Sequence, residues 1–260
     1  MSTETASKTT VVVPFYNDSA EIQPTLEALG KQTLKPAMVL ISDDASSAEE
    51  WRAMEELSKS YPDLNLKLLR SEVNTGPGKA RERAILQTET PYIAFCDADD
   101  LFLPDRIEKS EALLDQHGGF VWSGSFRELD GKRSPMDRSK AFGGQEPIEA
   151  YIVAGRINKF TSTISAETTT LQKMIFREDL KYYEDFFTLL QGYKLGKVQY
   201  IEEPLSVKVD RSTSYSNARK GSVLIKKVRA RLWLNVLLAK VGYSWGNLLK
   251  WNFMRLTGQL

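Results

Sequence analysis

Four consecutive residues, Asp97-Ala98-Asp99-Asp100, place three carboxylates directly after the short apolar stretch at residues 91–96. Carboxylates this close repel one another unless a cation lies among them. Hard divalent ions such as Mg²⁺ and Mn²⁺ take oxygen ligands, and proteins often hold them with one or two carboxylates plus the phosphates of a substrate. The motif therefore indicates a metal site for a phosphorylated substrate. A solvated turn that caps the next helix is the alternative.

The stretches around this motif alternate between two kinds of pattern. Short apolar runs predict strands, and amphipathic segments between them predict helices. The predicted strands lie at residues 9–14, 37–42, 64–69 and 92–96, and the helices at residues 21–32, 48–60 and 78–87. Strands that are apolar throughout and separated by helices indicate a parallel sheet with both faces covered. We therefore predict an α/β fold with a Rossmann-like, mostly parallel sheet flanked by helices.

Polar residues follow three of the predicted strands. Tyr16-Asn17-Asp18 comes after the first strand, Asp43-Asp44 after the second, and the acidic motif after the fourth. Parallel strands end at the same edge of a sheet, and ligands bind beyond that edge. We therefore expect these three groups to converge on one crevice.

The pattern is less regular in the second half of the chain. A helix at residues 106–116 and a strand at residues 120–129 lead to an Asp130-Gly131 turn. The polar stretch that follows, residues 132–145, is interpreted as a lid or acceptor loop. Further on, Glu184-Asp185 begins a predicted helix, and residues 197–201 form the last predicted strand.

The composition excludes several classes of protein. The 260 residues suffice for one sizeable domain, and the N-terminus lacks the basic start and apolar stretch of a signal peptide, so we expect a cytoplasmic protein. Cys96 is the only cysteine and His117 the only histidine. An intramolecular disulfide, a multi-histidine zinc site and a Ser-His-Asp hydrolase are therefore not expected. Cys96 is predicted to be a buried, inert thiol.

Charge is distributed unevenly along the chain. From Arg211 to Leu260 there are ten Lys or Arg residues and no Asp or Glu, so the rest carries about nine net negative charges. Basic residues interleaved with Trp and Leu are typical of an interfacial helix, and we predict that residues 219–255 contact anionic membrane at the inner face of the plasma membrane. The alternative is a helical pair packed on the domain. Nucleic acid is not expected as a partner, because no recognition motif accompanies the charge.

The order of the motifs resembles family two of the inverting nucleotide-sugar glycosyltransferases, of the bacterial cell-surface polysaccharide type, which have the A-type glycosyltransferase fold. The resemblance covers residues 9–215. It implies that Pro14-Phe15-Tyr16-Asn17, after the first strand, holds the nucleotide base and ribose. It also implies that Asp43-Asp44 is the second-strand signature, in which Asp44 contacts the base.

The same resemblance assigns roles to the next two motifs. Residues 74–81 would form the tight entry to a helix, with Gly76 permitting the turn and Lys79 or Arg81 facing the donor phosphates. Asp97, Ala98 and Asp99 match the Asp-x-Asp motif that binds the nucleotide sugar through a divalent cation, Mn²⁺ or Mg²⁺. Such a cation would stabilise the charge on the departing diphosphate.

An inverting transfer also needs a base to take the proton of the acceptor hydroxyl. By resemblance Asp185 is this base, and Glu184 supports the site. The chain departs from the family in two places. Asp210 stands where a histidine near the metal is usual, so we predict the metal ligands Asp99, Asp100 and Asp210, with Arg211 contacting the diphosphate. Glu82 stands where an asparagine is usual.

The resulting hypothesis is a metal-dependent glycosyltransferase that moves a sugar from a nucleotide donor, a uridine diphosphate sugar by resemblance, to a hydroxyl of a cell-surface glycan or lipid-linked acceptor. A non-catalytic nucleotide-sugar or glycan-binding protein on the same fold is the alternative, followed by a nucleotidyltransferase. The predicted division is a disordered N-terminus (1–8), a glycosyltransferase domain (9–215) and a helical basic tail (216–260). Within the domain, residues 9–117 form the nucleotide-binding half and 118–215 the acceptor half.

Overall fold

The computed structural model describes residues 6–136, 160–176, 184–195, 198–210, 232, 234–240 and 242–257. Its strands are β1 (Thr9–Phe15), β2 (Met38–Asp43), β3 (Leu66–Arg70), β4 (Tyr92–Phe95), β5 (Leu101–Phe102), β6 (Phe120–Leu129), β7 (Lys132–Pro135), β8 (Ile164–Glu167) and β9 (Val198–Val209). Its α-helices are α1 (Ile22–Gly30), α2 (Ala48–Ser58), α3 (Pro77–Leu86), α4 (Arg106–His117), α6 (Thr168–Leu171), α7 (Glu184–Leu195) and α9 (Trp245–Thr257). Short 3-10 helices span Pro62–Leu64 and Thr161–Thr163.

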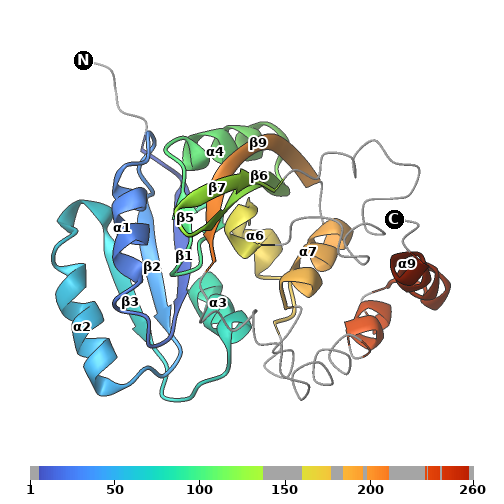
Figure 1. Ribbon diagram of the computed structural model, residues 1–260, viewed down its shortest axis with the longest axis horizontal. Helices are drawn as coiled ribbons and strands as arrows, with labels where there is room; N and C mark the ends of the chain where they lie inside the picture. The colour runs from blue at the N-terminus through green and yellow to red at the C-terminus, as the bar shows by residue number, and fades with distance from the viewer. Residues whose placement is uncertain are drawn as a thin grey trace.

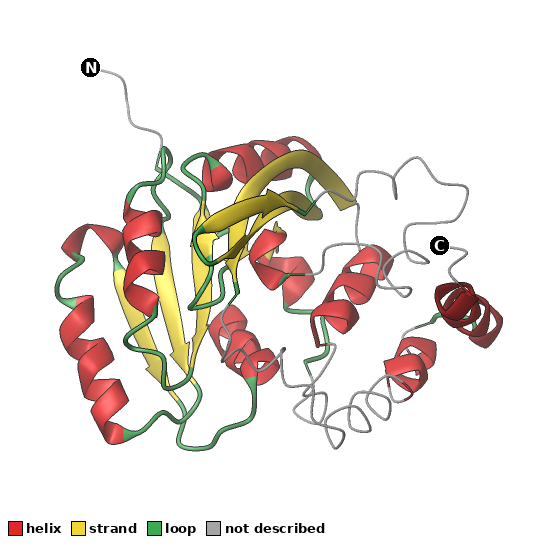
Figure 2. Cartoon of the chain, viewed as in Figure 1, coloured by secondary structure: helices red, strands yellow, loops and turns green. Residues whose placement is uncertain are grey.

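The strands form one mixed sheet in the order β3-β2-β1-β4-β8-β6-β9-β5, with β7 paired to β6. β1 runs parallel to both β2 and β4, and β2 runs parallel to β3, so these four strands end at the same edge. β8 is antiparallel to β4 and β6, while β9 is parallel to β6. Helices cover the sheet, and β9 curves strongly beside β6 (Figure 1 and Figure 2). The predicted Rossmann-like, mostly parallel sheet flanked by helices is confirmed.

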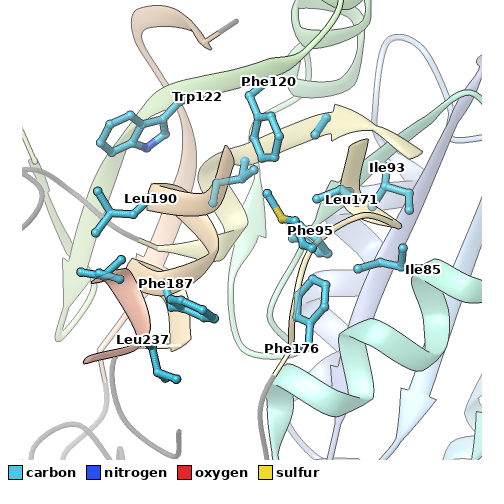
Figure 3. Close-up of a cluster of buried hydrophobic side chains, with 14 of the residues drawn as sticks. Ile85, Ile93, Phe95, Phe120, Trp122, Leu171, Phe176, Phe187, Leu190 and Leu237 are labelled. Carbon is cyan, nitrogen blue, oxygen red and sulfur yellow. The ribbon is translucent and has the colours of Figure 1, made fainter. Parts of the chain in front are cut away.

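The central strands bury side chains on both faces of the sheet. Val11 and Val13 of β1 belong to one buried cluster, which includes residues of α1, α2 and α4. Val12 points the opposite way and belongs to a second cluster, which includes residues of α3, α6 and α7. Figure 3 shows part of this second cluster, with Trp122 of β6 close to Leu190 of α7. Both faces are therefore covered, as the uniformly apolar strands predict.

Two predictions about single segments are corrected. Residues 132–135, which we expected in a polar lid loop, form β7, because they pair with β6 through the Asp130-Gly131 turn. Residues 6–8, which we expected to be disordered, are held by α4: Ser7 Oγ donates a hydrogen bond to Glu111 Oε2 (2.8 Å), and the Lys8 ammonium pairs with Asp115 (2.8 Å). Met136 is also described, and its N–H donates to the Ser125 carbonyl oxygen (2.8 Å), whereas residues 137–145 of the expected lid lie outside the described residues.

The last strand is longer than predicted and reaches the acidic motif. β9 continues to Val209 because it pairs with β6 along most of its length, with a register shift around Gly124. A Cβ atom at Gly124 would lie 2.6 Å from the Glu202 carbonyl oxygen, so the close strand contact requires glycine there. Beyond this point β9 also pairs with β5, where Leu101 lies opposite Val207. This pairing places residue 208 beside the end of the acidic motif.

The described part of the basic tail packs on the domain. Leu234, Leu237 and Leu238, together with Leu248 and Trp251 of α9, are buried in the same cluster as α7. The Tyr243 hydroxyl donates a hydrogen bond to the Leu190 carbonyl oxygen (2.8 Å). For these residues the structure confirms helix packing on the domain, and Figure 1 places α9 at the edge of the molecule. None of the described helices is long and apolar enough to cross a membrane.

Candidate functional site

The turn after β1 is tied to the turn after β2. The Asn17 side-chain oxygen accepts a hydrogen bond from the Ser47 N–H (2.9 Å), and the Asp44 N–H donates to the Phe15 carbonyl oxygen (2.9 Å). Tyr16 is 52% exposed and open to a ligand, whereas the Phe15 side chain is buried in the core. Pro14 lies within β1 and is half-buried. A nucleotide contact by the Phe15 side chain is therefore excluded, because core packing faces it inward.

The two aspartates after β2 organise neighbouring loops. Asp43 is buried, accepts hydrogen bonds from Ser46 and lies 3.6 Å from the Arg70 guanidinium. Asp44 is also buried and accepts from the N–H groups of Thr75 (3.1 Å) and Gly76 (2.6 Å). The loop before α3 is thereby fixed to the end of β2. The Thr75 hydroxyl (3.1 Å) and the Arg83 guanidinium (3.4 Å) also contact the Asp44 carboxylate. A base contact by Asp44 stays a prediction.

The entry to α3 has the tight geometry that its sequence predicts. Gly76 has a φ angle of +91°, which favours glycine, and Pro77 begins the helix. The Lys79 ammonium pairs with the Glu82 carboxylate one turn along the same helix. The departure from the family at Glu82 therefore supplies a partner for Lys79.

Arg81 does not face open solvent, as a phosphate ligand would. Its side chain is 5% exposed, and its guanidinium lies 2.5 Å from Asp97 Oδ1 and 3.0 Å from Thr161 Oγ1. The Asp97 carboxylate also accepts from Thr161 Oγ1 (3.1 Å). The predicted phosphate contact of Arg81 is therefore corrected: this guanidinium is buried against Asp97 and orients that carboxylate.

The acidic motif is held by hydroxyls from the segment before β8. Ser162 Oγ accepts from the Asp97 N–H (3.0 Å) and donates to Asp100 Oδ2 (2.5 Å). The Ala98 carbonyl oxygen accepts from the Thr25 hydroxyl of α1 (2.8 Å). Asp100 is fully buried, whereas the side chains of Asp97 and Asp99 are 25% and 23% exposed. Asp97 and Asp99 are therefore the acids that a ligand could reach.

A lysine that the sequence analysis did not single out lies among these acids. The Lys208 ammonium is 3.1 Å from Asp100 Oδ1 and 3.5 Å from Asp99 Oδ1. Its side chain is 16% exposed, and the ammonium lies 5.7 Å from the centre of the Phe160 ring. No local pattern indicated this position, because the predicted strand ended at residue 201 and the pairing of β9 with β5 and β6 is a non-local contact.

The buried charges shift one another's protonation. Burial lowers the pKa of Lys208, but the carboxylates of Asp100, Asp97 and Asp99 outweigh it, so the net pKa is raised. Burial would raise the pKa of Asp97, yet Arg81 and Lys208 hold it below its usual value. Burial, with Asp97 and Asp99 nearby, raises the pKa of Asp100 to about 7 despite Lys208. Two cations of the chain therefore balance much of the charge that the motif concentrates.

The carboxylate oxygens of the motif are of the type that binds Mg²⁺ or Mn²⁺, but basic residues of the chain already pair with them. Among the described residues, no group of three or more His, Cys, Asp or Glu side chains is arranged to hold a metal ion. The predicted ligand Asp210 pairs instead with Arg127 of β6. Asp99 and Asp100, the other two predicted ligands, both contact Lys208. The predicted set of Asp99, Asp100 and Asp210 is therefore not assembled, because a basic residue of the chain neutralises each of its members.

The predicted base lies on a helix of the second cluster. Glu184 and Asp185 are the first two residues of α7, whose Phe187 and Leu190 are buried against β6 and the tail. The side chains of Glu184 and Asp185, and all of Arg211, lie outside the described residues. Their predicted roles stay predictions. The polar groups after β1, β2 and β4 are brought to one edge of the sheet, as expected, because these strands run parallel.

Comparisons with known proteins identify a family model and several relatives that this chain resembles. The family model "Glycosyl transferase family 2" matches residues 10–183. The poly(ribitol-phosphate) beta-N-acetylglucosaminyltransferase TarS of Staphylococcus aureus is 28% identical over 220 residues, which are 82% of this chain and 36% of TarS. The amylovoran biosynthesis glycosyltransferase AmsB of Erwinia amylovora is 29% identical over 203 residues, which are 75% of this chain and 67% of AmsB. The chain thus spans about a third of TarS.

Two solved structures share the fold. S. aureus TarS 1-349 in complex with UDP-GlcNAc has a TM-score of 0.71 at 20% identity, covering 95% of this chain and 71% of that one. The mannosyltransferase PcManGT from Pyrobaculum calidifontis, in complex with GDP-Man and Mn²⁺, has a TM-score of 0.66 at 18% identity, covering 97% and 71%. At these identities the likeness establishes the fold.

Proposed function

Because the chain belongs to glycosyl transferase family 2, we propose that it is an inverting glycosyltransferase that moves a sugar from a nucleotide donor to a hydroxyl acceptor. The observation that carries the proposal is the convergence of the Asp97–Asp100 motif with the polar turns after β1 and β2 at one edge of the sheet. The donor is a uridine diphosphate sugar and the acceptor a cell-surface glycan or lipid-linked precursor. The solved complex of TarS with UDP-GlcNAc supports the choice of donor, and the names of TarS, a poly(ribitol-phosphate) beta-N-acetylglucosaminyltransferase, and AmsB, an amylovoran biosynthesis glycosyltransferase, support the choice of acceptor.

In this proposal the residues divide the work between binding and proton transfer. Tyr16 and Asn17 contact the nucleotide, and Asp97 and Asp99 face its diphosphate. A divalent ion, Mn²⁺ or Mg²⁺, held at these carboxylates would stabilise the negative charge that develops on the leaving diphosphate. Asp185 takes the proton of the acceptor hydroxyl as it attacks the anomeric carbon from the opposite face. Glu184 orients the base.

A thermal-shift panel tests the proposal. Uridine and guanosine diphosphate sugars are added singly to the protein, each with and without Mn²⁺, and the melting temperature is measured. Stabilisation by one uridine diphosphate sugar, larger with Mn²⁺, is expected, because a ligand that binds only the folded state raises its melting temperature. The proposal fails if no nucleotide sugar shifts the transition at millimolar concentration.

We also propose that the tail brings the enzyme to the inner face of the plasma membrane, where lipid-linked acceptors lie. Trp245, Leu249 and Phe253 follow one another every four residues along α9, so they share one face of the helix. They are 52%, 66% and 60% exposed, whereas Leu248 and Trp251 on the other side are buried. This apolar face belongs to a segment of the chain, residues 211–260, with ten basic and no acidic residues, a combination that suits an anionic lipid surface.

Flotation with vesicles tests this membrane contact. We expect the wild-type protein to float with vesicles that contain phosphatidylserine at low salt, and a Trp245→Ser, Leu249→Ser, Phe253→Ser variant to remain unbound. Leu86→Ser is the control, because Leu86 is 62% exposed on α3 and does not belong to the tail segment. Wild-type protein that fails to float at low salt, where electrostatic attraction is strongest, would exclude the contact.

A further inference from the structure

Lys208 stands where the proposed donor site needs a cation. Its ammonium lies within 3.5 Å of both Asp99 and Asp100, closer than any other cation of the described residues lies to these two acids. The other cation of the cluster, Arg81, contacts Asp97. With all three acids ionised, the cluster and its two basic partners carry about one net negative charge.

The fold fixes Lys208 in this place. Lys208 is paired with Arg127 of β6, and the two residues before it, Ser206 and Val207, are paired with β5 on the other side of β9. The neighbouring Val207 is fully buried and Ser206 nearly so. The Lys208 side chain has little exposed surface and lies near the Phe160 ring. Because the ammonium is held next to the carboxylates, its local concentration there is high, and it competes with any divalent cation that could bind to them.

We propose that Lys208 is a built-in counter-ion that holds the affinity of the acidic cluster for divalent cations low in the donor-free protein. A divalent ion at Asp99 would meet both the repulsion of the ammonium and the loss of its ion pairs. The ammonium must move aside before the carboxylates can serve as ligands. The inference rests on the proposed function only in taking this cluster as the place of the cation.

Mn²⁺ titration of the donor-free protein, followed by electron paramagnetic resonance of the free ion, tests the proposal. Lys208→Met removes the charge and keeps most of the apolar stem. We expect its Kd for Mn²⁺ to fall at least tenfold below that of the wild type, an order-of-magnitude estimate from the charge removed. Lys208→Arg keeps the charge and should retain the weak wild-type affinity.

Two further variants make the result decisive. Lys109→Met removes a surface lysine that pairs with Asp105 and Glu203, and should leave the Kd unchanged. Lys208→Gln can still donate a hydrogen bond to Asp100, so it replaces Lys208→Met if that variant does not fold. With Lys208→Gln, Mn²⁺ should also raise the melting temperature more than it does in the wild type.

The counter-ion role is overturned if the neutral Lys208 variants bind Mn²⁺ no more tightly than the wild type. This outcome is distinct from failure of the proposed function. A protein that binds no nucleotide sugar could still gain Mn²⁺ affinity on losing Lys208, which would leave the counter-ion role intact. If the protein binds a nucleotide sugar but the neutral Lys208 variants bind Mn²⁺ with the wild-type affinity, only the counter-ion role is overturned and the proposed function stands.

Discussion

Asp185→Asn should lower the rate of nucleoside diphosphate release from the donor by about a thousandfold, measured with an acceptor extract under saturating donor. General base catalysis typically contributes two to four orders of magnitude, and an amide of the same shape cannot take up the acceptor proton. The thermal shift caused by the donor should persist, because the exchange removes the base and keeps the volume of the side chain.

Glu184→Gln is the matched comparison for this result, since it makes the same chemical change one residue earlier on α7. We expect a smaller loss there, as Glu184 is assigned to orienting the base. If Asp185→Asn releases nucleoside diphosphate as fast as the wild type, the enzymatic assignment must be dropped. The alternative of a non-catalytic nucleotide-sugar or glycan-binding protein on the same fold would then be favoured.

Arg81→Met should lower the free energy of unfolding by about 3 kcal/mol, because it removes one partner of a buried ion pair and leaves the other charged. Arg81 is almost fully buried and pairs with Asp97 at 2.5 Å, while Asp97 keeps a quarter of its surface exposed. Urea unfolding of the donor-free protein measures the change.

Lys79→Met provides the control for Arg81→Met on the same helix. Lys79 pairs with Glu82 at a more exposed position, so its loss should cost less than about 1 kcal/mol. The double variant Arg81→Met, Asp97→Asn should recover much of the loss, because no uncompensated charge remains. Equal effects of Arg81→Met and Lys79→Met would contradict a structural role for the Arg81–Asp97 pair.

The first half of the fold was predictable from local patterns. Apolar runs such as Val11-Val12-Val13 indicate a strand buried on both faces, and the structure confirms this. β7 was missed because Lys132–Pro135 is polar and exposed, so only its pairing with β6 makes it a strand. The full length of β9 was missed for a related reason, since β6 and β5 determine it from far along the chain.

The candidate site shows the same division between local and non-local information. The acidic motif and the Gly76-Pro77 helix entry were predictable, because several motifs in one order along the chain are more specific than any one of them alone. The partners of these groups were not readable. Arg81 faces Asp97, and Lys208 faces Asp99 and Asp100, because of how helices and strands pack. Sequence reasoning assigned cation binding to a metal and did not consider a lysine of the chain.

The central claim is that the acidic motif receives the donor diphosphate. Its most direct test is calorimetric titration of wild type and Asp99→Ala with the donor found in the thermal-shift panel, in the presence of Mn²⁺. A carboxylate beside a diphosphate repels it and can assist binding only through a cation. We therefore expect Asp99→Ala to weaken donor binding at least tenfold, on the order of 1.4 kcal/mol, while the exposed control Asp63→Ala binds as the wild type does. Unchanged or tighter donor binding by Asp99→Ala would contradict the claim.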